Sequence, residues 1–69
     1  MLDEFLPAIE EVQADGAVVL LKWDGLRSAK KYTVVVTNAE VDYVWREDSD
    51  DMAQSIQRTL ADYKTARDL

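Results

Sequence analysis

Apolar residues recur along the chain first with a helical period, then with the two-residue period of strands, and finally with a helical period again. Near the start, five of them fall on one side of a 3.6-residue repeat: Leu2, Phe5, Leu6, Ile9 and Val12. Proline suits the first turn of a helix but not its interior, so Pro7 predicts that the regular helix begins there or at Leu6, after an irregular lead-in. We therefore predict a helix at about residues 5–14, and Asp15-Gly16 supplies its C-terminal cap.

The middle of the chain is rich in β-branched and aromatic residues and is divided by turn signals. Asp24-Gly25 and Asn38-Ala39 separate three such segments, which predict strands at about residues 17–23, 31–37 and 41–46. Parallel pairing needs a long crossover, so these short connections favour an antiparallel meander.

The last segment predicts a second helix at about residues 49–67. Met52, Ile56, Leu60 and Tyr63 recur at spacings of four, four and three residues. An acidic run at residues 47–51 precedes them and offers N-cap residues and negative charge for the positive end of the helix dipole. The predicted fold class is therefore α+β, a single small domain over residues 1–69 with a three-stranded antiparallel β-meander flanked by N-terminal and C-terminal helices (α-β-β-β-α).

Side chains alternate across a strand, so the predicted sheet has two unlike faces. We assign one face to the core, under the two helices: Ala17, Val19, Leu21, Trp23, Tyr32, Val34, Val36, Val41, Tyr43 and Trp45. The second face mixes threonines and charges with apolar residues, and its candidate interaction residues are Val18, Leu20, Val35, Val44 and Arg46. A contiguous apolar patch there would indicate an interface, whereas scattered aliphatic residues would be an ordinary solvated face. If the helices lie on opposite faces, this set is core instead.

Chain length and composition restrict how such a domain is stabilised. At 69 residues, folding buries only about 60% of the surface of the unfolded chain. The sequence contains neither cysteine nor histidine, which removes disulfides and the usual ligands of structural zinc. Tight packing and self-association remain as the sources of stability.

The net charge of −6 arises from 14 acidic and 8 basic residues. This charge would repel a phosphate backbone and favours a basic partner, although it also serves solubility alone. One segment of this acidic chain carries a net positive charge. Its basic residues lie beside Trp23 and Tyr32 and are candidate nucleic-acid contacts: Lys22, Arg27, Lys30 and Lys31. Residues 40–51 carry six acids against Arg46 alone. If the two segments lie at opposite ends they favour self-association, and if they are adjacent they neutralise each other.

The residues needed for catalysis are mostly missing. Ser28, Ser49 and Ser55 have no histidine to activate them. The acidic run at residues 47–51 offers hard oxygen ligands for a divalent cation, but it lacks the spacing of a calcium loop, and helix capping explains the same residues. We therefore expect no enzymatic activity, no metal and no cofactor.

Targeting signals are also missing from the start of the sequence. Asp3 and Glu4 stand where a signal peptide would carry basic residues, and the longest apolar run, residues 17–21, is too short to span a bilayer. We expect a cytoplasmic protein without membrane contact.

Taken together, these features predict a small acidic protein-binding module that inhibits or adapts a larger protein, or pairs with itself as a homodimer. Its binding surface would be the second sheet face, the aromatic rim or the acidic segment. The alternative is a nucleic-acid-associated protein that binds through the basic loop Lys22–Lys31.

Overall fold

The computed structural model describes residues 2–69, so Met1 lies outside it. A short 3-10 helix, η1 (Leu2–Phe5), leads into α1 (Leu6–Ala14), which is followed by the strands β1 (Val18–Trp23) and β2 (Tyr32–Asn38). The turn η2 (Ala39–Val41), the strand β3 (Tyr43–Ser49) and the helix α2 (Met52–Arg67) complete the chain. The sheet order is β1-β2-β3 with both pairs antiparallel, which confirms the predicted α-β-β-β-α fold.

The start of α1 follows from its proline. Pro7 occupies the first turn, where its missing N–H has no helical partner to lose, and the residues before it form η1. At the other end, Gly16 has φ of +104°, a backbone conformation that residues other than glycine rarely adopt. The chain thereby reverses tightly from α1 into β1.

The third strand lies later in the sequence than we predicted, at Tyr43–Ser49 instead of 41–46. The side chain of Asn38 accepts the Glu40 N–H at 3.1 Å and starts η2, and Asp42 ends this turn in the left-handed region with φ of 54°. The prediction that Val41 faces the core is therefore wrong, because this valine lies in the turn and is exposed.

The acidic run is also divided differently from the prediction. Its first residues, Glu47 and Asp48, belong to β3, and α2 begins only at Met52. Asp51 alone acts as the N-cap, since its side chain accepts the Gln54 N–H at 3.0 Å. Helix capping thus explains one residue of the run.

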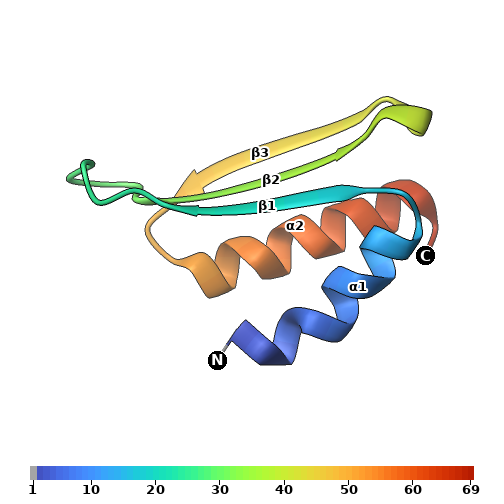
Figure 1. The fold of residues 1–69 in the computed structure, drawn as a ribbon, viewed down its shortest axis with the longest axis horizontal. Helices are drawn as coiled ribbons and strands as arrows, with labels where there is room; N and C mark the ends of the chain where they lie inside the picture. Colours follow the sequence, from blue (N-terminus) through green and yellow to red (C-terminus); the bar gives the residue numbers. More distant parts are fainter. Residues whose placement is uncertain (1) are drawn as a thin grey trace.

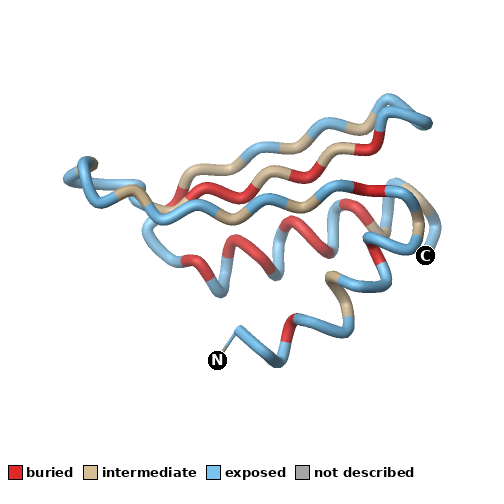
Figure 2. Tube along the Cα trace, viewed as in Figure 1, coloured by how far each residue is buried: buried red, intermediate tan, exposed pale blue. Residues whose placement is uncertain are grey.

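Both helices cover the same face of the sheet (Figure 1). α2 packs against β2 and β3, and α1 lies beside α2 and beneath β1. Burial follows this layering, because the most buried strand is the central one and the buried positions of α2 face the sheet (Figure 2). The core consists of Phe5, Val12, Ala17, Val34, Val36, Met52, Ile56, Leu60 and Tyr63.

One polar cluster lies inside this apolar layer and joins three elements. Asn38 at the end of β2 is 2% exposed, and its amide nitrogen donates to the Tyr63 hydroxyl at 2.9 Å and to the Asp15 carbonyl at 3.3 Å. The Tyr63 hydroxyl donates in turn to the Asp15 carboxylate at 2.6 Å, and Arg67 Nε donates to the same oxygen at 2.8 Å. The cluster therefore fastens the C-terminal ends of α1 and α2 to the end of β2.

The charge on Asp15 is stabilised by these contacts. Hydrogen bonds from Arg67 and then from Tyr63 lower the pKa of the Asp15 carboxyl. A carboxyl group with a lowered pKa in the folded state contributes stability above its unfolded pKa, and that contribution is lost as the pH falls through the folded pKa. At neutral pH the ionised cluster thus holds the two helices together.

We predict that Tyr63→Phe lowers the free energy of unfolding by about 1–3 kcal/mol, because it leaves the buried Asn38 amide with an unpaired donor. The matched control is Tyr43→Phe, which removes a hydroxyl that donates to Asp62 at the surface at 2.6 Å. This second change should cost no more than about 0.5 kcal/mol. Urea unfolding of the two variants measures the difference, and equal losses would contradict a structural role for the buried cluster.

Candidate protein-binding surfaces

Because both helices lie on one side, no helix among residues 2–69 covers the other face of the sheet. We call it the open face, and the strand registers arrange it in three rows: Val18, Thr37 and Val44; Leu20, Val35 and Arg46; Lys22, Thr33 and Asp48. Val44 is 78% exposed, Leu20 58% and Val18 56%, whereas Val35 at the centre is half-buried. The structure therefore brings all five predicted interaction residues onto one surface, with its apolar part at one end.

The other end of the open face is charged and internally bonded. The hydroxyl of Thr33 donates to Asp48 Oδ1 at 2.6 Å, and Arg46 and Arg27 each place a nitrogen 3.5 Å from the same oxygen. On the β1 side, Lys22 Nζ lies 3.5 Å from Asp24 Oδ2. The open face thus divides into an apolar end and an end of paired charges.

These contacts also decide where the basic loop lies relative to the acidic segment. Arg27 pairs with Asp24 and Asp48, and the Lys30 backbone N–H donates to Asp50 Oδ1 at 2.5 Å. The two segments are therefore adjacent, and three acids stand among the four predicted nucleic-acid contacts. Within residues 2–69, only Lys30 and Lys31 of those four have side chains outside any ion pair. The geometry offers a phosphate backbone little net positive charge.

The carboxylates of residues 47–51 point to different partners. Arg58 of α2 donates to Glu47 through Nε at 2.9 Å, and Asp48 lies on the open face. Across residues 2–69, no three acidic side chains gather in a group that could hold a metal ion.

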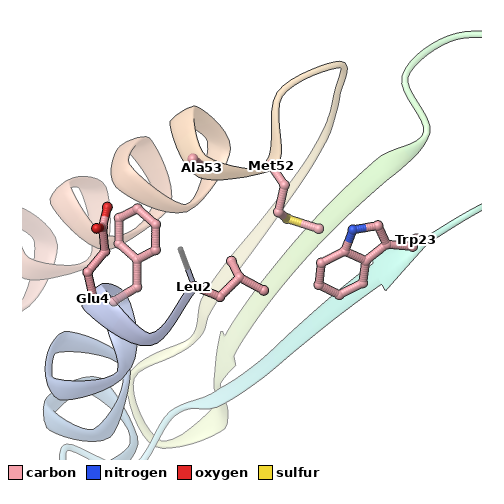
Figure 3. Close-up of a pocket in the computed structure, with 6 residues that line it drawn as sticks. Leu2, Glu4, Trp23, Met52 and Ala53 are labelled. Atoms are coloured by element: carbon pink, nitrogen blue, oxygen red, sulfur yellow. The ribbon is translucent and has the colours of Figure 1, made fainter.

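An apolar pocket of about 340 Å³ opens where α1 diverges from the sheet. It lies between η1, the last residue of β1 and the first turn of α2, and its lining residues are Leu2, Glu4, Phe5, Trp23, Met52 and Ala53. In Figure 3 the side chains of Leu2 and Met52 point toward the indole ring of Trp23. Trp23 is 54% exposed, so a large aromatic residue borders the pocket.

Sequence reasoning missed this pocket because it assigned Trp23 to the core face of the sheet, under the helices. The signal was Pro7, which marks the first turn of α1 and leaves Leu2 and Phe5 in the 3-10 helix before it. The predicted core face was otherwise correct in its side-chain direction, including Trp23, which points to the helix side.

The pKa values of two carboxyl groups reflect the charged end of the open face. The Leu26 backbone N–H, followed by the nearby Lys22 and Arg27, lowers the pKa of Asp24. The hydrogen bond from Thr33, with the charges of Arg46 and Arg27, lowers the pKa of Asp48. Both groups are therefore ionised at neutral pH, and each holds Arg27 in place.

No protein-family model matches the sequence, and comparison with curated proteins and with solved structures finds no significant similarity. Neither α1 nor α2 is long and apolar enough to cross a membrane, and the same holds for the short helices among residues 2–69.

We predict that the double variant Asp24→Asn, Asp48→Asn is less stable than the parent at pH 7, and that the difference shrinks as the pH falls below about 4. Both native carboxyl groups have lowered pKa values, so the stability they contribute is present above the unfolded pKa and disappears on acidification. Chemical unfolding from pH 7 to pH 3 measures this dependence. The control is Asp42→Asn, on an exposed turn residue, and a difference that grows on acidification would refute the assignment.

Proposed function

We propose that this chain is a non-catalytic protein-binding module and that its open face binds the open face of a second copy. The observation that supports this proposal is the uncovered apolar end of the sheet, where Val18, Leu20 and Val44 are each more than half exposed. Contiguous apolar surface of this kind on a small protein is typical of an interface. A chain without disulfides also gains stability from association.

The division of the open face favours a second copy as the occupant. A two-fold axis parallel to the strands places β1 over β3 of the partner and preserves the rows. The row of Val18, Thr37 and Val44, called the apolar row, then packs on the same row of the second copy. The row of Lys22, Thr33 and Asp48 is called the charged row. Here Lys22 lies opposite Asp48 of the other copy, so opposite charges meet on both sides of the axis.

The size of the open face limits the strength of the dimer. Three strands about 4.8 Å apart and six to seven residues long present a small surface, roughly 15 by 20 Å. This area falls below the usual 800 Å² or so per partner of a stable interface, so the dimer should be weak. Measurement must therefore extend to about millimolar protein, in enough salt to screen the repulsion between two acidic chains.

We predict a concentration-dependent dimer that Val44→Lys dissociates, with a dissociation constant raised by about tenfold or more because an ammonium group would be buried in the apolar row. Sedimentation equilibrium from micromolar to millimolar protein measures this constant. The matched control is Val41→Lys, on an exposed valine in η2 that lies off the open face, and it should leave the constant unchanged.

Two results would overturn the proposal: a monomer throughout the concentration range, or a dimer that both lysine variants affect equally. A third variant tests the orientation. Lys22→Glu places like charges opposite each other in the charged row and should weaken the dimer more in low salt than in high salt.

A further inference from the structure

The two edges of the sheet differ in how well they are protected. The Asp24 N–H bonds the Lys31 carbonyl at 2.8 Å and continues the β1–β2 register. Because hydrogen-bonded pairs alternate along an antiparallel ladder, Val18, Leu20 and Lys22 bond to β2. The backbone N–H and C=O groups of Val19, Leu21 and Trp23 therefore point to the free edge of β1.

Within residues 2–69, no other strand pairs with that free edge, since β1 is the outer strand of the sheet. Its sequence, VVLLKW, has no proline and a single charge, and the register with β2 is continuous over all six residues. The other outer strand, β3, carries Arg46, Glu47 and Asp48. Charged edges discourage strand pairing and apolar edges permit it, so the edge of β1 is the one able to accept another strand.

The pocket lies at the end of this same edge. Trp23 contributes its backbone groups to the free edge and its indole to the pocket wall, so the two features share a residue. A strand added beside β1 would direct alternate side chains to the helix side of the sheet. The one opposite Trp23 or just beyond it would enter the space between Leu2, Phe5 and Met52 (Figure 3).

We propose that the free edge of β1 and the adjoining pocket form a binding site for an extended peptide segment of a partner protein. The segment adds antiparallel to β1 as a fourth strand, and it places one large apolar side chain in the pocket. This inference rests on the proposal that the chain is a protein-binding module, but not on the dimer, because the edge and the pocket lie off the open face.

The charges around the pocket select a basic segment. Asp3 belongs to η1, and Asp50 and Asp51 directly precede the first turn of α2. Lining residues from these two elements are thus flanked by carboxylates, and basic residues on either side of the apolar side chain would complement them. The net charge of −6 would also increase the association rate with a basic segment.

The probe is the capped peptide acetyl-Lys-Thr-Phe-Thr-Val-Thr-Lys-amide, in which phenylalanine and valine share one face. Titration calorimetry should show binding, and NMR should place the largest amide shifts at Val19, Leu21 and Trp23. Methylating the backbone nitrogens of the phenylalanine and valine should abolish binding, because these are the N–H groups that pair with β1 in an antiparallel ladder. Methylating two threonine nitrogens, which point away, should not.

Ala53→Phe tests the pocket in the protein itself. Ala53 is an exposed lining residue, so the larger side chain fills the pocket without removing a core contact. It should weaken peptide binding by about ten- to a hundredfold, the equivalent of one lost apolar side chain. Ala61→Phe makes the same change at another exposed alanine of α2 and should leave the affinity unchanged.

The outcomes separate this inference from the dimer. A monomeric Val44→Lys variant should bind the peptide as tightly as the parent does. If both methylated peptides bind equally well, or if shifts fall on the open face, strand addition to β1 is wrong. Binding of lauric acid, with no binding of the peptide, would assign the pocket to an acyl chain and overturn the proposal.

Discussion

The buried amide of Asn38 links the C-terminal ends of both helices to the end of β2. This side chain can be buried only if its donors and acceptor are all paired, and its partners come from three separate elements: the Asp15 carbonyl, the Tyr63 hydroxyl and the Glu40 N–H. A polar network of this kind tolerates little displacement, because any shift leaves an unpaired group in an apolar layer. It therefore fixes one end of the domain, where α1 ends, β2 ends and α2 ends.

At the opposite end, no buried amide among residues 2–69 joins the helices to the sheet as Asn38 does. Near the fixed end, Lys64 of α2 pairs with Glu11 of α1 at 3.3 Å, and Arg67 bonds Asp15. Toward its start, α1 diverges from α2 (Figure 1). The pocket beside Trp23 lies in this region, between η1 and the first turn of α2. The domain is thus closely bonded at the end that holds the Asn38 cluster and has a pocket at the end that holds Trp23.

The periodicity of the sequence predicts the order and type of both α-helices and the three strands, because local alternation depends only on neighbouring residues. It fails where a side chain overrides the local pattern. Asn38 caps η2, which moves the start of β3 to Tyr43 and turns Val41 outward, and nothing in the alternation of residues 41–46 shows this. Which face of the sheet the helices cover also depends on tertiary packing and not on local sequence. The identity of the residues on the open face could be predicted, but their exposure depends on both helices lying on the same side of the sheet.

Exposure of the sheet has different physical consequences at its face and at its edge. On the face, apolar atoms meet water and the gain from covering them is proportional to area, so a small three-stranded sheet can support only a weak contact. At the edge of β1, unpaired backbone groups add directional hydrogen bonds, which fix register as well as affinity. Trp23 belongs to both the edge and the pocket, and it therefore couples backbone pairing to the burial of one side chain. In the two proposed modes of binding, specificity accordingly comes from the edge of β1, while the open face contributes association between like copies.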